Sequence, residues 1–184
     1  MTPTLVESEI GFAPGVLAAP GMTFDGLLTR YQAELYRFAL HLTRNRADAD
    51  DLYQETLIKA YRAFDRLDHA ANHRAWLYRI ATNTFLSGRR RSAREELLDE
   101  EEALDIPAEQ TDHAASLDAR DLLREVAAFV DGLPPKQRVA LVLRKYQGLG
   151  YDEIASNLET TAGAARANVH EALRKLRERF DDRL

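Results

Sequence analysis

Residues 133–177 contain a short amphipathic segment between two longer ones, and this pattern limits the chain to few folds. The first segment, residues 136–146, follows two prolines, has apolar residues at helical spacing and is followed by two glycines. The middle segment, residues 152–158, is too short to be a stable helix by itself. Neighbouring helices must therefore cover its apolar face.

The third segment should begin after Thr161, which can cap a helix, and end near Phe180. Its inward stripe has a spacing of three and four residues. The stripe consists of Ala165, Val169, Ala172, Leu176 and Phe180. A short helix between two longer ones predicts a helix-turn-helix, and the alternative is a three-helix bundle with a solvated outer face.

Outside its apolar stripe, the third segment carries polar or small residues. They are Arg166, Ala167, Asn168, His170, Glu171 and Arg174. An α-helix fits the major groove of DNA, where arginine donates to guanine, asparagine pairs with adenine and a carboxylate accepts from cytosine. Small residues permit close approach, so this face is predicted to bind duplex DNA.

The net charge of -5 does not by itself suit a protein that binds anionic DNA. The acidic residues are concentrated, however, because residues 95–116 contain nine of them and no Lys or Arg. Residues 23–94 carry +5 and residues 117–184 carry +1. We therefore predict an all-α chain of two small helical domains, 23–94 and 117–184, joined by an acidic flexible linker over 95–116. Residues 1–22, with little periodicity, are predicted to be a flexible tail.

Several other classes of protein are disfavoured by composition. The chain has no cysteine, no apolar run long enough to span a bilayer, and an acidic start, so a cytoplasmic protein without membrane insertion is expected. No nucleophile-base pair or Gly-rich phosphate loop is evident, which argues against an enzyme. His69 and His73 are four residues apart, but no third ligand follows, so no metal and no cofactor are predicted.

The first domain should contain three helices. One runs from Phe24 to about Thr43, and a second begins at Asp48. The core face of the second helix is expected to hold Leu52, the stem of Glu55, Ile58 or Leu57, and Tyr61. After a polar loop over 65–74, a third helix should run from about Ala75, with Trp76 in the core, and end in Gly88 and the basic run that follows it.

A basic run at the end of the third helix follows its aromatic residues. It consists of Arg89, Arg90, Arg91 and Arg94. Basic residues next to aromatic ones suit a surface that holds a phosphate backbone and stacks an unpaired base. A helix dipole favours basic residues at its C-terminus, which accounts for one of these arginines but not for all of them.

Three stretches together resemble one family, the bacterial sigma factors of the extracytoplasmic-function type. DADDLYQETLIKAYRAF (48–64) is similar to the helix with which these proteins bind core polymerase, and WLYRIATNTF (76–85) followed by RRR is similar to their promoter-melting helix. LPPKQR, LGYDEIA and AGAARANVHEALRKLR are similar to their helix-turn-helix for the "minus thirty-five" element. The resemblance covers about 155 of the 184 residues.

The resemblance implies roles for individual residues. It implies polymerase contacts at Asp48, Asp51, Leu52, Gln54, Glu55, Ile58 and Lys59. It implies "minus ten" DNA contacts at Asp68, His69, His73, Arg74, Asn83, Arg89, Arg90 and Arg91. It assigns "minus thirty-five" contacts to the six outer-face residues already named. Asn83 and the 65–74 loop would hold a flipped base, with the alternative that Asn83 only bonds a neighbouring backbone group.

The resemblance also implies partners: core RNA polymerase, promoter DNA and an anti-sigma factor. The acidic linker would thread the polymerase cleft, where its charge mimics nucleic acid. The leading hypothesis is therefore a sigma factor that selects promoters and begins strand opening. One alternative is a sigma-like decoy that binds an anti-sigma factor without binding DNA, but this alternative does not explain the basic run. Another, a helix-turn-helix repressor, leaves DLYQE (51–55) and the acidic segment unexplained.

The sequence departs from the family pattern at three places. Glu159 stands in the turn where glycine is usual, so either the turn differs or Glu159 adopts a strained conformation. Ala164 and Ala165 replace a usual Thr-Val pair, which removes a hydroxyl. His73 stands where an aromatic carbocycle is common.

Overall fold

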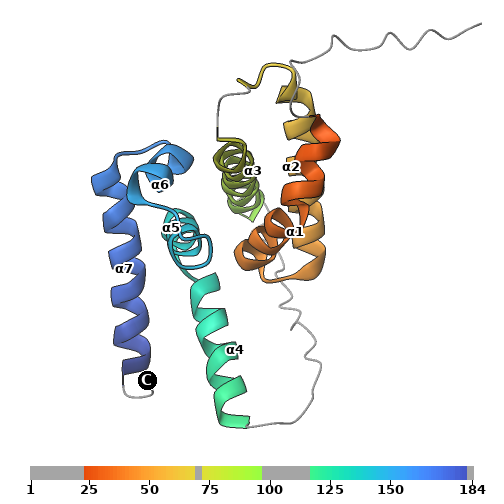
Figure 1. The fold of residues 1–184 in the computed structure, drawn as a ribbon. Helices are drawn as coiled ribbons and strands as arrows, with labels where there is room; N and C mark the ends of the chain where they lie inside the picture. Colours follow the sequence, from red (N-terminus) through yellow and green to blue (C-terminus); the bar gives the residue numbers. More distant parts are fainter. Residues whose placement is uncertain (1–22, 69–71, 97–116, 182–184) are drawn as a thin grey trace, which may run out of the picture.

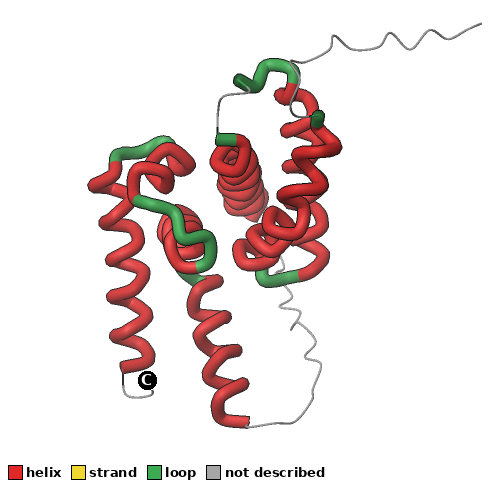
Figure 2. The backbone as a smooth tube through the Cα atoms, in the orientation of Figure 1, coloured by secondary structure: helices red, strands yellow, loops and turns green. Residues whose placement is uncertain are grey.

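The computed structural model describes residues 23–68, 72–96 and 117–181. These residues form seven helices and contain no strand, which confirms the predicted all-α class (Figures 1 and 2). The helices are α1 (Phe24–Thr43), α2 (Arg46–Phe64), α3 (His73–Glu96), α4 (Leu117–Asp131), α5 (Pro135–Lys145), α6 (Tyr151–Leu158) and α7 (Ala162–Phe180). The predicted tail at 1–22, nearly all of the predicted linker, and His69 lie outside the described residues.

Helices α1, α2 and α3 form the first domain, and short polar residues fix where they begin. The Thr23 hydroxyl accepts from the backbone N–H of Gly26 at 3.1 Å and so caps α1. Asn45 caps α2 by accepting from Ala47 at 2.8 Å. Arg44, between them, takes a left-handed conformation that ends α1, so the chain reverses within two residues.

The predicted core face of α2 was wrong at Tyr61. Tyr61 is 66% exposed, and its ring makes an edge-to-face contact with Phe24, with ring centroids 5.2 Å apart. Of the two candidates at the preceding turn, Ile58 is 51% exposed and Leu57 packs against the core. The buried stripe is Ala49, Leu52, Thr56, Ala60 and Phe64. Small residues in this stripe let α2 approach its neighbours closely, which apolarity alone did not predict.

Helix α3 carries the basic run in its last turns, as predicted. It begins at His73, where the Asn72 side chain accepts from the backbone N–H of Ala75 at 3.1 Å. It continues past Gly88 and through the basic run to Glu96. Arginine is a good helix former, and a single glycine costs a helix only about 1 kcal/mol, so Gly88 does not end it. Trp76 is half-buried and packs against the core, as predicted.

Helices α4 to α7 form the second domain, with the predicted helix-turn-helix at α6 and α7. The Thr161 hydroxyl caps α7 by accepting from the backbone N–H of Ala164 at 3.2 Å, as predicted. The inward stripe of α7 is buried except at Leu176, which is half-buried. Glu159 ends α6 with a φ of 49°, so the strained conformation is the one adopted.

The two domains pack against each other rather than standing apart. The sequence predicts two small helical domains, and in the structure buried residues of α1, α2 and α3 and of α5, α6 and α7 form one continuous cluster. A smaller cluster under α4 contains Leu133, Leu141 and Ala172. In Figure 1, α3 lies between the first domain's α1 and α2 and the second domain's α5 and α6, and it contacts all four.

Candidate nucleic-acid interface

The outer face of α7 is open to solvent. Ala165 and Val169 fix its orientation because both are fully buried against the rest of the helix-turn-helix. Among the predicted reading residues, Arg166, Ala167, His170 and Arg174 are exposed, and Asn168 and Glu171 are half-buried. The structure therefore brings all six predicted residues to one accessible helix.

Several of these side chains are already paired within the protein. Arg174 donates to Glu171 through Nε at 3.0 Å and Nη2 at 2.6 Å, and also to Glu178. The hydrogen bonds and charge of Arg174 hold the pKa of Glu171 below its usual value. Asn168 donates to the Ala164 carbonyl at 3.0 Å. Contact with base edges would therefore require these polar groups to exchange partners.

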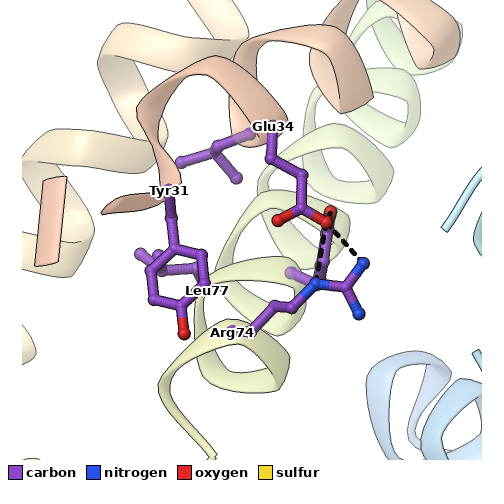
Figure 3. Close-up of a pocket in the computed structure, with 6 residues that line it drawn as sticks. Tyr31, Glu34, Arg74 and Leu77 are labelled. Carbon is purple, nitrogen blue, oxygen red and sulfur yellow. Dashed lines mark hydrogen bonds and ion pairs between the residues drawn. The ribbon is translucent and has the colours of Figure 1, made fainter. Parts of the chain in front are cut away.

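At the start of α3, Arg74 joins a network that crosses between the domains. Its Nε donates to Glu34 Oε1 at 2.7 Å, and its Nη2 donates to the same oxygen. The Nη2 also donates to the Gln147 carbonyl, at 3.2 Å. Figure 3 shows Arg74 reaching across to Glu34 of α1, beside Tyr31 and Leu77. Arg74 was predicted to bind DNA, but in this form its guanidinium is occupied by the protein.

The Tyr78 hydroxyl lies 2.7 Å from Glu34 Oε1 and 2.7 Å from Gln147 Oε1. One hydroxyl carries one proton, so it donates to the carboxylate, and turning the Gln147 amide places its NH₂ toward the tyrosine oxygen. Burial alone would raise the pKa of Glu34, but hydrogen bonds from Arg74 and Tyr78 and the charge of Arg74 lower it. Burial and Glu34 raise the pKa of Tyr78. The network is thus built on an ionised Glu34 and a protonated Tyr78.

Asn83, two turns further along α3, is half-buried and also meets the second domain. Its Nδ2 donates to Glu159 Oε1 at 3.2 Å. The alternative that Asn83 bonds a neighbouring backbone group is not what this structure shows, because its partner is a side chain 76 positions away. The residue predicted to hold a flipped base therefore has a carboxylate in place of a base.

The remaining predicted "minus ten" residues fall into two groups. Arg89, Arg90 and Arg91 are exposed on α3, and Arg90 donates to the Ser87 hydroxyl at 3.2 Å. Asp68 is exposed at the edge of the loop, whereas His73 is half-buried, with a buried Nε2 that has no protein partner. The exposed arginines lie beyond Asn83 toward the end of α3, where DNA could reach them, whereas the Nε2 atom of His73 is buried and out of reach.

Helix α2 presents most of the predicted polymerase residues. Asp48, Asp51, Gln54, Ile58 and Lys59 are exposed, and Glu55 is half-buried. Glu55 pairs with Lys59 at 2.8 Å, and Lys59 also donates to the Thr84 hydroxyl at 3.2 Å. Leu52 is the exception. It is 7% exposed and belongs to the core, so its role is to support α2 rather than to contact a partner.

Comparison with known proteins identifies the two halves separately. A family model described as Sigma-70 region 2 matches residues 27–95, and one described as Sigma-70, region 4 matches residues 123–176. The chain is 31% identical to the RNA polymerase sigma-H factor of Pseudomonas aeruginosa over 81% of each protein. The chain belongs to the extracytoplasmic-function sigma factors of bacterial RNA polymerase.

Other sigma factors show the same relationship. The ECF RNA polymerase sigma factor SigE of Mycolicibacterium smegmatis is 34% identical across 85% of this chain, which spans 61% of that protein's length. The structure is similar to the sigma factor RpoE of Bartonella quintana, solved with the anti-sigma factor NepR, with a TM-score of 0.69 and 28% identity over 84% of this chain and 94% of that one. It is also similar to CnrH, solved with the cytosolic domain of CnrY, with a TM-score of 0.61 and 26% identity over 88% and 89% of the two chains.

Some important residues of this sigma factor were missed by the sequence reading. Glu34 and Gln147 both bond to Arg74 and Tyr78 of α3, but each is a single polar residue with no local pattern around it. Their significance depends on contacts with residues 40 to 73 positions away. Only the partner's position, which one sequence does not reveal, could have identified them.

The pairing of Glu171 gives a first testable prediction. We expect Glu171→Ala to change the sequence preference of duplex binding several-fold at one position, because it removes a carboxylate near base edges and frees Arg174 from one partner. Arg174→Ala should instead weaken binding across all sequences and reduce its dependence on salt. Selection from a random duplex library distinguishes the two. If Glu171→Ala selects the same sequences as the wild type, Glu171 does not take part in reading.

Proposed function

We propose that this sigma factor directs core RNA polymerase to a specific set of promoters and begins to open the DNA there. The observation that carries the proposal is that two helices with nucleic-acid chemistry, α7 and α3, lie in the two segments that match Sigma-70 regions 4 and 2. A decoy that never binds DNA is less well supported. It needs neither the exposed Arg89–Arg91 run nor the open outer face of α7.

The proposal divides the work between the two domains, 23–94 and 117–184. Helix α7 would read the "minus thirty-five" duplex through Arg166, which is exposed, and through Asn168, which would exchange its bond to the Ala164 carbonyl for a base edge. Helix α3 would hold unpaired "minus ten" DNA through Asn83 and Arg74, and the exposed arginines would contact phosphates. Each step uses binding energy alone, so the proposal includes no catalytic site in this chain.

The exposed acidic side of α2 is the proposed polymerase contact. Asp48 and Asp51 lie near the start of the helix, and Gln54 and Ile58 continue the same exposed surface. Acidic groups flanking an exposed apolar side chain suit a partner with a basic rim and an apolar centre. Residues 95–116 would follow the polymerase cleft, since their acidic charge resembles that of nucleic acid.

An anti-sigma factor is the proposed regulator. The RpoE and CnrH structures that resemble this chain are complexes, the first with the anti-sigma factor NepR and the second with the cytosolic domain of CnrY.

No helix among the described residues is long and apolar enough to cross a bilayer. Because core polymerase works inside the cell, we propose a cytoplasmic location for the chain.

Run-off transcription tests the proposal directly. Core polymerase alone, core polymerase with the chain, and core polymerase with a heat-unfolded sample of the chain would each transcribe a library of promoter fragments. We expect defined transcripts only with the folded chain, and enrichment of a two-part motif among the transcribed fragments. A chain that binds core polymerase but never yields transcripts above those of core alone would contradict the proposal and favour the decoy.

Charge reversal on α2 gives a second prediction. Asp51→Lys combined with Glu55→Lys should weaken binding to core polymerase about tenfold or more, because like charges then meet across the interface. The change also breaks the Glu55–Lys59 pair, a loss of roughly 0.3–0.5 kcal/mol that leaves the fold intact. Asp152→Lys, an acid-to-base change at an exposed position of α6, is the control and should bind core polymerase normally. Undiminished co-purification of the α2 double variant with core polymerase would remove this assignment.

A further inference from the structure

The ring of Tyr151, the first residue of α6, lies beside two arginines from the neighbouring helices. The guanidinium carbon of Arg166 on α7 is 5.0 Å from the ring centroid, and that of Arg144 on α5 is 4.9 Å from it. Both distances are within the roughly 6 Å over which an aromatic ring attracts a cation. Helix α6 packs against both α5 and α7 (Figure 1). One helix of the helix-turn-helix therefore supplies a ring to a side chain of the other.

The backbone around Tyr151 fixes where its ring can lie. The Gly150 N–H donates to Glu153 Oε2 at 2.8 Å, and the Gly150 carbonyl accepts from the Ile154 N–H at 3.0 Å, which closes the first turn of α6. Ile154 is fully buried, and Tyr151 is half-buried against the same core. A tyrosine side chain also has only two rotatable χ angles. The ring is therefore the rigid member of the contact, and Arg166 is the flexible one.

The two arginines differ in what else they bind. Arg144 donates to the Leu149 carbonyl at 2.9 Å, which ties its side chain to the turn before α6. Arg166 is exposed and makes no hydrogen bond or ion pair within the described part of the chain. The ring attracts its guanidinium through π-electrons and supplies no oxygen acceptor, so the N–H donors of Arg166 stay available. Arg166 can therefore donate to DNA while it stays against Tyr151.

Arg166 is also the best-placed reading residue of α7. It lies near the start of the helix, where helix-turn-helix proteins contact base edges. Arg174 is bonded to Glu171 and Glu178. Asn168 is bonded to a backbone carbonyl. These side chains must exchange partners to reach a base, whereas Arg166 need not. A bidentate pair with guanine O6 and N7 requires a defined orientation of the guanidinium, which a fixed ring can provide.

We propose that Tyr151 is a positioning residue for Arg166, and that its ring orients the Arg166 guanidinium toward a guanine of the "minus thirty-five" element. A side chain that is oriented before DNA arrives loses less entropy when it binds. The preference for guanine at one base pair thus depends on α6 as well as on α7. The inference rests on the proposed function, in which α7 reads a duplex, but the contact between ring and guanidinium does not depend on it.

The expected effects of the two residues differ in size. A bidentate arginine–guanine pair discriminates against other bases by about five- to a hundredfold, and Arg166→Met should remove this preference at one base pair. An exposed cation–π contact is worth a factor of about two to five. Tyr151→Leu keeps an apolar side chain but loses the ring. It should therefore lower the guanine preference at the same base pair by about two- to fivefold.

Selection from a library of promoter duplexes, by the full chain bound to core polymerase, measures these preferences. Tyr151→Phe keeps the ring and should retain the wild-type preference. Tyr146→Leu is the matched control, because it is the same change at a tyrosine whose ring stacks on His41 of α1 with centroids 3.9 Å apart. It should select the same duplexes as the wild type. An unchanged guanine preference in Tyr151→Leu, or an equal loss at every position of the element, would overturn the proposal.

A double-mutant cycle separates positioning from support of the fold. If the ring acts through Arg166, Tyr151→Leu should have no further effect at that base pair in the Arg166→Met background. An equal effect in both backgrounds would mean that Tyr151 acts through the packing of α6, and the proposal would be wrong. It would also be wrong if Arg166→Met changed no base preference, because Arg166 would then contact phosphate alone.

The contact itself can be measured without DNA, by NMR of the arginine Nε–H groups in the free full chain. The ring current of Tyr151 should displace the Arg166 Nε–H resonance, which Arg166→Lys identifies by its disappearance. The displacement should vanish in Tyr151→Leu and persist in Tyr151→Phe. A wild-type resonance without displacement would contradict the proposal at the contact. If the displacement is present but the wild-type complex selects no duplex, the proposed function fails, and the inference fails with it at the DNA rather than at the contact.

Discussion

Replacing Arg138 with methionine is expected to lower the free energy of unfolding by about 2 to 4 kcal/mol, the largest stability effect predicted for this chain. Arg138 is 5% exposed, and its guanidinium donates to the Leu42 carbonyl at 2.8 Å, to the Val130 carbonyl at 3.0 Å and to Asp131. The buried Leu42 carbonyl left without its donor costs about 1 to 3 kcal/mol, whereas the Val130 carbonyl keeps the backbone N–H of Leu133 at 3.2 Å. Asp131 contributes less to the loss, because its side chain is 41% exposed and Arg44 lies 3.9 Å away.

The position of Arg138 also predicts how the variant unfolds. Leu42 lies in the last turn of α1 in the first domain, whereas Val130 and Asp131 belong to α4 of the second. The Arg138 side chain therefore joins the two domains. Without it, we expect the two domains to unfold in separate steps instead of one. Urea unfolding followed by circular dichroism, together with fluorescence of Trp76 in the first domain, would show whether the transitions separate.

Two variants complete that experiment. Arg138→Lys keeps the charge but loses the fork that reaches several acceptors, so its loss of stability should be intermediate. Arg124→Ala breaks only an exposed pair with Asp121 and should change the free energy of unfolding by less than about 1 kcal/mol. If Arg138→Met were no less stable than Arg124→Ala, the bond from the guanidinium to the Leu42 carbonyl would not hold the domains together.

Local features of the fold could be predicted from sequence because each depends on neighbours in the chain. The Thr161 cap and the inward stripe of α7 are examples, since both follow from spacings of three and four residues. Tyr61 shows the limit of this reasoning. An apolar residue at helical spacing can lie at the rim of a core as well as inside it, and the helix that decides between the two is remote in sequence.

In the candidate site, too, features of a single helix could be predicted and contacts between remote segments could not. The six outer-face residues of α7 lie outside its buried stripe as predicted, because a polar face opposite an apolar stripe is a property of one helix, and their contacts with DNA stay a prediction. The state of Asn83 and Arg74 could not be predicted, because their partners Glu159, Glu34 and Gln147 come from other helices and turns. Sequence similarity is the basis for proposing what these residues bind in a working complex, and it says nothing of what they bind when the chain is alone.

Asn83→Ala is expected to reduce promoter opening by about ten- to a hundredfold within the polymerase complex. A flipped base costs a few kcal/mol to remove from the stack, and a two-sided amide contact returns about 1 to 3 kcal/mol of it. Permanganate reactivity of unpaired thymines measures the opening. Duplex binding should stay normal, because the α7 residues do not contact Asn83.

The same variant should behave in opposite ways in two settings, which separates a DNA contact from a structural role. On a promoter already mismatched at the flipped position, the defect of Asn83→Ala should be smaller, because the cost of extrusion is absent. In the free chain, the loss of the Glu159 contact should make the domains open more readily. Asn83→Asp keeps the shape but replaces the donor with a second carboxylate facing Glu159, so it should open the free chain further and still fail at strand opening. An equal defect on matched and mismatched promoters would mean that Asn83 supports the fold, and base capture would then fall to Arg74 and the loop before α3.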